Sequence, residues 1–123
     1  MEEMKEFPSA EETARALVER QLDAYNRHNL EDFCDCFAED VQVWRLGQKE
    51  PLALGAGAFR MIYRERFTKN PKIQAQVPNR VVLGPFVVDE EIVTGFGKDT
   101  LRVVAIYRSN GEKIDRVWFL RPD

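Results

Sequence analysis

The last third of the chain constrains the fold most, because two apolar segments are joined there by a turn. Residues 101–107 and 113–120 flank Asn110-Gly111, a dipeptide that readily adopts the positive φ angles of a tight hairpin turn. The pattern predicts a two-stranded antiparallel hairpin. Successive side chains of a strand point to opposite faces, and both faces of this hairpin carry large apolar residues. We therefore expect helices of the same domain to cover one face and a partner to cover the other.

Capping signals predict two helices near the start of the chain. Ser9 and Glu12 have the spacing of a capping box, in which each side chain accepts a hydrogen bond from a free backbone N–H. The first helix should therefore begin near Ala10. Asn29 can cap a second, shorter helix that continues to Phe37.

The middle of the chain alternates between strand and helix patterns. The strands predicted ahead of the hairpin are 41–46, 52–54, 73–83 and 86–96. A third helix opens at Gly55 and ends before Pro71, since the residue ahead of a proline avoids helical angles. Pro78 cannot donate to a strand ladder, so it marks a bulge or an edge position. This order predicts an α+β domain with its three helices on one face of a curved antiparallel sheet.

The third helix and the residue stretch after it are basic. The positive residues there are Arg60, Arg64, Arg66, Lys69 and Lys72. We interpret them as a solvated helix face, with an anion-binding patch as the alternative.

The composition is that of one globular domain. With 44% hydrophobic and 32% charged residues, the chain of 123 residues can bury a core of its own. We expect a tail over residues 1–8 and a single domain over residues 9–123. No apolar run approaches the roughly 20 residues that cross a bilayer, so we expect no membrane partner. The acidic N-terminus lacks the apolar core of a secretory signal, which predicts a cytoplasmic location.

The charges and cysteines disfavour several kinds of partner. A net charge of −3 gives no general attraction to nucleic acid. Cys34 and Cys36 would point to nearly opposite sides of a helix, so we expect reduced thiols. With one histidine and no Cys-x-x-Cys motif, the sequence carries no zinc signature, and we expect no metal and no cofactor.

Three motifs in order resemble the nuclear transport factor 2-like superfamily. They are residues 22–26 (LDAYN), residues 37–41 (FAEDV) and residues 110–114 (NGEKI). The superfamily includes ketosteroid isomerases and polyketide cyclases of the SnoaL type. The resemblance implies a cystatin-like cone, in which a sheet wraps around a long helix and an apolar pocket opens at one end. It also implies a homodimer that packs sheet on sheet.

The positions that carry catalysis in the isomerases are different here. The resemblance places Gln21 at the enolate-binding tyrosine, Arg45 at the catalytic aspartate and Ala105 at the protonated aspartic acid. Isomerase chemistry requires a general base, and an arginine with a pKa above ~12 cannot be one near neutral pH. We therefore do not expect steroid isomerisation by the superfamily's usual residues.

Other polar residues can still serve the pocket. Arg45 would bring a fixed cation into the cone, either to bind a carboxylate or enolate or to reach the rim and form an ion pair there. The acids available to it on strands are Asp89, Glu91 and Asp115. The pocket candidates are Gln21, Tyr25, Arg45, Tyr63, Ala105, Tyr107, Asp115, Val117 and Phe119.

The opposite sheet face is the candidate dimer surface. Strand alternation places Trp44, Arg116 and Trp118 there, and tryptophan and arginine are favoured at the centres of interfaces. A bulge would invert the alternation and turn Trp118 into the pocket, so this alternative stays open.

These features lead to a general functional hypothesis. We expect the cone to bind a small apolar or weakly anionic molecule, with a cofactor-independent isomerase, cyclase or lyase type of activity. The alternative is a non-catalytic small-molecule-binding or dimerisation module. A macromolecular adaptor would need an exposed apolar patch beyond the dimer face. Whether a reaction is catalysed depends on an ionisable group in the pocket.

Overall fold

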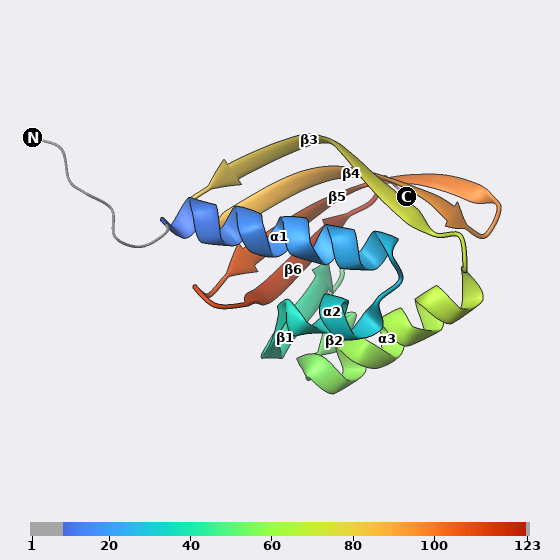
Figure 1. The fold of residues 1–123 in the computed structure, drawn as a ribbon, viewed down its shortest axis with the longest axis horizontal. Helices are drawn as coiled ribbons and strands as arrows, with labels where there is room; N and C mark the ends of the chain where they lie inside the picture. Colours follow the sequence, from blue (N-terminus) through green and yellow to red (C-terminus); the bar gives the residue numbers. More distant parts are fainter. Residues whose placement is uncertain (1–8, 123) are drawn as a thin grey trace, which may run out of the picture.

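The computed structural model describes residues 9–122, which form three helices and a sheet of six strands (Figure 1). The helices are α1 (Ala10–Asn26), α2 (Leu30–Asp35) and α3 (Gly55–Lys69). The strands are β1 (Phe37–Arg45), β2 (Ala53–Leu54), β3 (Gln74–Leu83), β4 (Phe86–Phe96), β5 (Asp99–Ser109) and β6 (Ile114–Leu120). No helix within residues 9–122 is long and apolar enough to cross a membrane. The α+β class predicted from the sequence is confirmed.

The sheet is mixed, where the sequence predicted an antiparallel one. Its strand order is β2-β1-β6-β5-β4-β3, and β1 pairs with β6 in parallel while the other neighbours are antiparallel. Phe37 at the start of β1 lies opposite Ile114 at the start of β6. No turn joins these two strands, so no local signal sets their relative direction, and the prediction of a purely antiparallel sheet was wrong at this pair.

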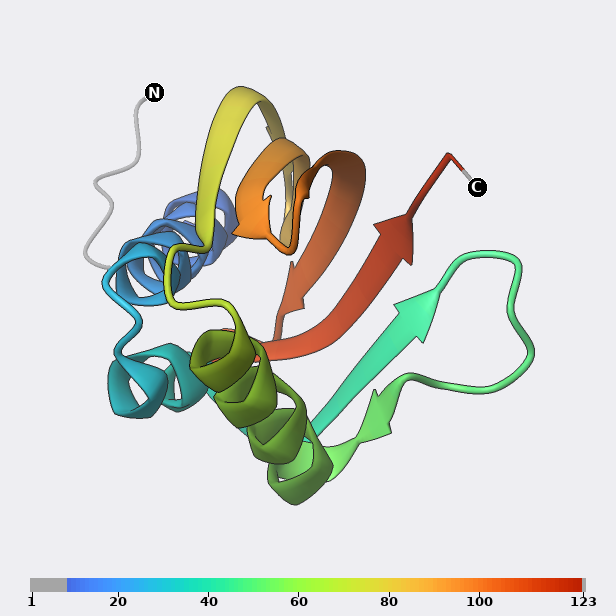
Figure 2. The same cartoon turned by 90° about the vertical axis from the view of Figure 1, so that its right-hand side faces the viewer.

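The helices lie on the inner face of a sheet that curls around them (Figures 1 and 2). Ser9 and Glu12 form the predicted capping box at the start of α1. At the other end of α1, Asn26 accepts a 2.7 Å hydrogen bond from the Ala75 backbone N–H and donates a 2.9 Å bond to the Ala75 carbonyl. This pair of bonds fixes the end of α1 to β3 and leaves α1 lying along the inside of the sheet.

The second helix is shorter than predicted. Asn29 caps it as expected, by accepting a 3.0 Å bond from the backbone N–H of Asp32. The helix ends at Asp35, and Phe37 begins β1 instead of continuing the helical stripe. The Phe37 ring still packs inward, 4.4 Å from the ring centroid of Phe59 in α3. Phe37 is therefore buried, as the helical spacing of apolar residues predicted, but it belongs to a strand and not to the helix.

Register shifts change which face some strand residues point to. Edge strand β3 shifts register between Gln76 and Asn79, the segment that contains Pro78, as the proline predicted. In β6 the register shifts between Ile114 and Arg116, so that Asp115 is an extra residue opposite β5.

A glycine permits a close approach next to the cavity described below. Gly95 has a φ of 75°, and a Cβ at this position would lie 2.2 Å from the Lys72 carbonyl oxygen. Only glycine fits without a backbone shift. The strand bends there, between Val93 and Phe96, and brings the Phe96 ring to the cavity wall.

Candidate functional site

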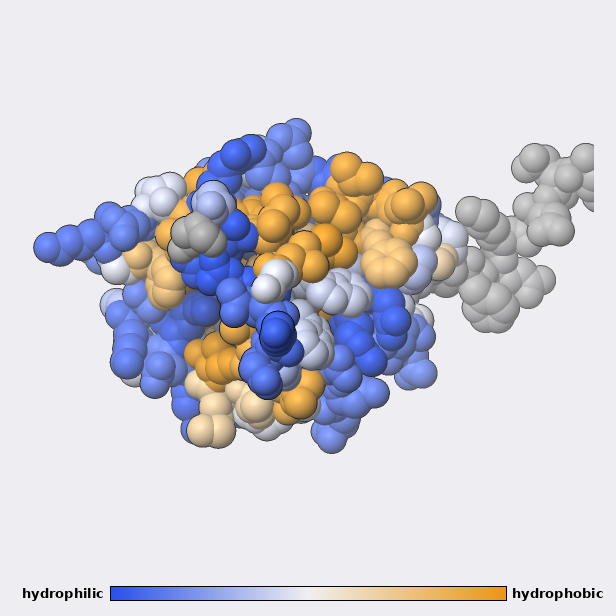
Figure 3. Space-filling model, turned by 180° about the vertical axis from the view of Figure 1, so that it is seen from behind, coloured by the Kyte–Doolittle hydropathy of each residue, from blue (hydrophilic) through white to orange (hydrophobic). Residues whose placement is uncertain are grey.

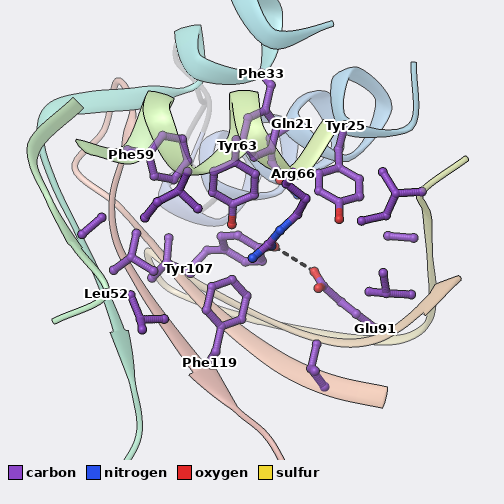
Figure 4. A pocket seen from close by; sticks show the side chains of 18 of the residues that line it. Gln21, Tyr25, Phe33, Leu52, Phe59, Tyr63, Arg66, Glu91, Tyr107 and Phe119 are labelled. Carbon is purple, nitrogen blue, oxygen red and sulfur yellow. Dashed lines mark hydrogen bonds between the residues drawn. The ribbon is translucent and has the colours of Figure 1, made fainter. Parts of the chain in front are cut away.

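A cavity of about 250 Å³ lies between the helices and the inner face of the sheet (Figure 4). Its wall is largely aromatic and aliphatic. The polar side chains that reach it include Gln21 and Tyr25 from α1, Tyr63 and Arg66 from α3, Glu91 from β4 and Tyr107 from β5. An apolar cavity with a few converging polar groups is the usual form of a small-molecule site.

Glu91 is the acid of this cavity. It lies on the inner face of β4 between Asp89 and Val93, and only 7% of its surface is exposed. The Tyr107 hydroxyl donates a 2.8 Å hydrogen bond to Glu91 Oε2. Burial raises the pKa of Glu91 to about 7, although the bond from Tyr107 opposes that shift. Near neutral pH this carboxyl can therefore both accept and release a proton.

The neighbouring acid on the same face has a different role. Asp89 is completely buried, and Arg80 donates bonds of 2.7 Å and 2.9 Å to its two oxygens. Arg80 also reaches Glu19 on α1, at 3.3 Å. This bidentate ion pair fixes Asp89 as a structural anion. Within residues 9–122 no ion pair includes Glu91, and its hydrogen-bond partner is the neutral Tyr107.

The tyrosines of the cavity remain neutral donors. Burial raises the pKa of Tyr25, Tyr63 and Tyr107. A phenol whose pKa is raised keeps its proton at physiological pH, so these hydroxyls can donate hydrogen bonds to an oxygen that becomes negative. Gln21, only 4% exposed, donates a 3.0 Å bond to the Val18 carbonyl within α1.

Arg66 brings a positive charge to the cavity from α3. Figure 4 shows its guanidinium pointing from the helix toward the sheet. Its Cζ lies 4.9 Å from the ring centroid of Tyr63 and 5.3 Å from that of Phe96. The sequence predicts a solvated face for the basic residues of this helix, and Arg66 is an exception because it is half-buried and lines the cavity. Arg60 donates a hydrogen bond to Glu31. Arg64 is exposed to solvent.

The structure gathers most of the pocket candidates from the sequence. Those at the cavity wall are Gln21, Tyr25, Arg45, Tyr63, Tyr107, Val117 and Phe119. Ala105 is fully buried within the sheet and is not among the lining residues. Asp115 is also outside the lining, because the bulge in β6 turns it toward Arg108, which donates bonds of 3.0 Å and 2.7 Å to its carboxylate.

The acids considered as partners of Arg45 contact other groups. Asp89 pairs with Arg80, Asp115 pairs with Arg108, and Glu91 accepts the Tyr107 hydroxyl. Each of the three acids therefore has a partner other than Arg45. Within residues 9–122 no three acids, histidines or cysteines are gathered in a way that could hold a metal ion.

The residues predicted for a dimer surface lie on the outer sheet face. Strand pairing aligns Val81, Val88, Ile106, Trp118 and Trp44 in one continuous line across five strands, which we call the outer row. Arg116 lies in the next line, opposite Arg108. Val81 is 61% exposed, and Figure 3 shows apolar side chains gathered on this face. Neither Trp44 nor Trp118 lines the cavity.

The sequence reasoning missed the roles of Glu91 and Arg66. The sequence suggests Glu91 only as a possible partner for Arg45. Glu91 shares one face of β4 with Val87 and Val93, but the other face also carries apolar residues, so alternation alone does not identify the inner side. Arg66 lies three residues after Tyr63 on α3, and this helical spacing was the available signal.

Comparisons with known proteins agree on the fold. An uncharacterised cystatin-fold protein from Novosphingobium aromaticivorans is 23% identical, with a TM-score of 0.80 over 94% of this chain and 100% of that one. A protein described as a candidate ketosteroid isomerase from Kribbella flavida is 24% identical, with a TM-score of 0.79 over 94% of this chain and 82% of that one.

A third solved structure is described as a candidate polyketide cyclase from Xanthomonas campestris pv. campestris. It is 23% identical, with a TM-score of 0.69 over 91% of this chain and 92% of that one. At such identities these likenesses show the cystatin-like, nuclear transport factor 2-like fold. No curated protein matches the sequence. The sequence matches the SnoaL-like domain over residues 18–117, and the chain therefore belongs to the family of SnoaL-like domains.

Proposed function

We propose that the cavity binds a small, largely apolar carbonyl compound and that Glu91 moves a proton on it. The observation that carries this proposal is the buried Glu91 carboxyl, which faces the cavity with a pKa of about 7. A group with such a pKa is present in both protonation states near neutral pH, which is the requirement for a general base that is regenerated in each cycle. The reaction class is cofactor-independent isomerisation or cyclisation, and a lyase reaction would begin with the same step.

The proposed step is proton abstraction next to a carbonyl group. Ionised Glu91 takes a proton from the carbon beside the carbonyl, the C–H electron pair forms the enolate double bond, and the charge moves to oxygen. A neutral Tyr25 or Tyr63 hydroxyl donates a hydrogen bond to that oxygen. In a β,γ-unsaturated carbonyl compound the charge extends to the γ carbon, and Glu91 returns its proton there, so the double bond moves next to the carbonyl without an oxidant or a cofactor. In a saturated ketone the proton returns to the same carbon, which gives exchange only.

The relatives support this choice of chemistry. Solved structures described as a candidate ketosteroid isomerase and as candidate polyketide cyclases share this fold. The base would come from a different strand than the resemblance implied, since Arg45 occupies the position of the isomerase base on β1 and Glu91 lies on β4. The proposal therefore keeps the reaction class and changes the residue that performs it.

The test is hydrogen–deuterium exchange at the carbon next to a ketone. Cyclohexanone and 2-tetralone in deuterated buffer, followed by proton NMR, should exchange faster with the native protein, and the Glu91→Gln variant should lose most of this acceleration. Glu90→Gln is the matched control, because Glu90 lies on the opposite face of the same strand. Equal acceleration by native protein and Glu91→Gln, or none by either, would refute the role of Glu91.

The alternative is a non-catalytic binding module, which the apolar wall of the cavity would serve equally well. In that case a neutral ligand such as 2-tetralone would bind with similar affinity to native protein and Glu91→Gln, and neither would accelerate exchange.

We further propose that the protein is a homodimer joined through the outer row. Five apolar side chains in line across a sheet form the kind of surface that another copy can cover. A cytoplasmic location stays a prediction from the sequence.

A further inference from the structure

Arg66 is a half-buried cation among aromatic rings. Its guanidinium lies over Tyr63 and Phe96. When an arginine stacks on aromatic rings, its N–H groups lie in the plane of the guanidinium and point away from the rings. They can therefore still donate hydrogen bonds to an acceptor at the edge of that plane. Figure 4 shows the Arg66 guanidinium pointing from α3 into the cavity, toward the sheet that carries Glu91.

The carboxylates around Arg66 are engaged with other groups. Asp89 is held by Arg80, and Glu65 on the same helix pairs with Lys69 at 3.6 Å. Glu91 accepts the Tyr107 hydroxyl. Within residues 9–122 no ion pair includes Arg66, whereas Arg80 on the same side of the sheet forms a bidentate pair.

The cavity is therefore asymmetric in charge. One wall carries a cation from α3, and the opposite wall carries an acid that is neutral below a pH of about 7. Arg45 and Arg121 also line the cavity, and the rest of the wall is mainly hydrocarbon. The volume of about 250 Å³ lies below the roughly 300–1,000 Å³ of common ligand pockets. Such a site fits a small molecule with one anionic end and an apolar remainder.

We propose that Arg66 binds a carboxylate of the natural ligand, which makes the substrate class small, largely apolar keto acids. This inference rests on the proposed function, because the ketone end is the part that Glu91 would deprotonate. The carboxylate accepts two parallel N–H bonds from the guanidinium, a geometry that lysine cannot reproduce. Arg66 thereby fixes which end of the molecule reaches Glu91.

The test compares a carboxylate with its isosteric neutral amide. The binding of 3-phenylpropionate and 3-phenylpropionamide is measured by titration calorimetry at pH 6, where Glu91 is mostly protonated. The native protein should prefer the carboxylate by about tenfold or more, as expected for a charge-assisted bond. Arg66→Met should abolish this preference by weakening carboxylate binding while leaving amide binding unchanged.

Two further variants test whether the carboxylate preference depends on the planar guanidinium or only on a positive charge, and whether it depends on that charge being at position 66. Arg66→Lys should keep only part of the preference for the carboxylate, since lysine retains the positive charge but cannot donate two parallel hydrogen bonds. Arg64→Met is the matched control: Arg64 is exposed on the same helix and does not line the cavity, so its loss should leave both affinities unchanged.

The inference would be overturned by equal affinities of the native protein for acid and amide, by an unchanged preference in Arg66→Met, or by no binding of the carboxylate. These outcomes are distinct from a failure of the proposed function. Exchange of neutral ketones through Glu91 does not require a contact between Arg66 and a carboxylate, so the native protein can show that activity while the keto-acid assignment fails.

Discussion

The Tyr107 hydroxyl reaches the Glu91 carboxylate at 2.8 Å although the two residues do not lie opposite each other in the sheet. Tyr107 pairs with Val87, and Glu91 pairs with Val103. The tyrosine side chain therefore extends along the inner face past the intervening pair, Asp89 and Ala105. A small residue at position 105 leaves room for this path. The alanine that departs from the isomerase pattern thus has a structural consequence here.

Removing the hydroxyl should raise the pKa of Glu91 further. In Tyr107→Phe the carboxylate loses the hydrogen bond that favours its ionised form, whereas burial, the main cause of the raised pKa, remains. The expected result is a Glu91 pKa clearly above 7, measured by carbon NMR of the side-chain carboxyl during a pH titration. Tyr25→Phe is the control, because no hydrogen bond joins Tyr25 to Glu91 within the described residues. A pKa that stays constant or falls in Tyr107→Phe would contradict this assignment.

Filling the space at position 105 should disturb the same bond. Ala105→Leu adds a branched side chain to a site with no exposed surface, and overpacking of this kind lowers stability by about 1–3 kcal/mol. Ala105→Ser adds one small atom and serves as the control. Chemical denaturation gives the stability, and the Glu91 titration shows whether the tyrosine still reaches its acceptor. If Ala105→Leu is as stable as the native protein and the Glu91 titration is unchanged, then the Tyr107 side chain does not need a small residue at position 105 to reach Glu91.

The ionisation of Glu91 should make stability depend on pH. Its pKa is raised from 4.5 to about 7, so the folded state binds more protons than the unfolded state within that interval. The free energy of unfolding therefore falls as pH rises from about 4.5 to 7, by on the order of 3 kcal/mol for this group at about 1.4 kcal/mol per pH unit. The charged and titratable groups that act on Glu91 are Tyr107, Asp89, Arg80 and Arg66.

Glu91→Gln should remove this dependence. The stability of the variant relative to the native protein is expected to increase between pH 5 and pH 8, as measured by urea denaturation at several pH values. The absolute difference at one pH depends also on how the amide fits, so the slope is the diagnostic quantity. Parallel stability curves for the two proteins would show that Glu91 has no raised pKa.

The elements of this fold were largely predictable, because each is encoded by local chemistry. The capping box at Ser9, the hairpin turn at Asn110-Gly111 and the proline in β3 each act within a few residues, and the structure contains the capping box, the hairpin and the register shift at the proline. In the turn only Gly111 has a positive φ, and the loop is four residues long, from 110 to 113. The parallel pairing of β1 with β6 and the bulge at Asp115 depend on contacts between distant segments. No short sequence pattern specifies such contacts.

The site was harder to predict than the fold for a related reason. Both faces of β4 mix apolar and acidic residues, since the inner face lines a cavity and the outer face carries the outer row. The alternation of residues along β4 therefore divides them between two faces but does not show which face lines the cavity. Asp89 and Glu91 also share one face, and only the position of Arg80 separates a structural ion pair from an acid that can titrate.

Breaking the buried ion pair should cost far more stability than breaking an exposed one. Arg80→Met leaves the fully buried Asp89 carboxylate without its bidentate partner, and losses of this kind are about 3–5 kcal/mol. The matched control is Arg102→Met, because Arg102 pairs with Glu90 on the outer face and is 74% exposed; we expect a loss below about 1 kcal/mol. Urea denaturation measures both. Similar losses in the two variants would mean that Arg80 is not a structural residue.

Trp118 should be a centre of the proposed dimer. It occupies the outer row between Ile106 and Trp44, and its ring centroid lies 6.4 Å from that of Phe86 on the same face. Large aromatic residues at the middle of an interface often contribute about 2 kcal/mol or more. Trp118→Ala is therefore expected to raise the dimer dissociation constant by at least about tenfold, measured by sedimentation equilibrium over a range of protein concentrations.

The control for this measurement is Met61→Ala. Met61 is 71% exposed but lies on α3 and not on the outer sheet face, so its truncation should leave the dissociation constant unchanged. A native protein that sediments as a monomer at all concentrations would refute the dimer itself. A dimer that is equally stable in Trp118→Ala would instead place the contact on another surface, because truncating one of the two tryptophans of the outer row has to weaken any interface that buries it.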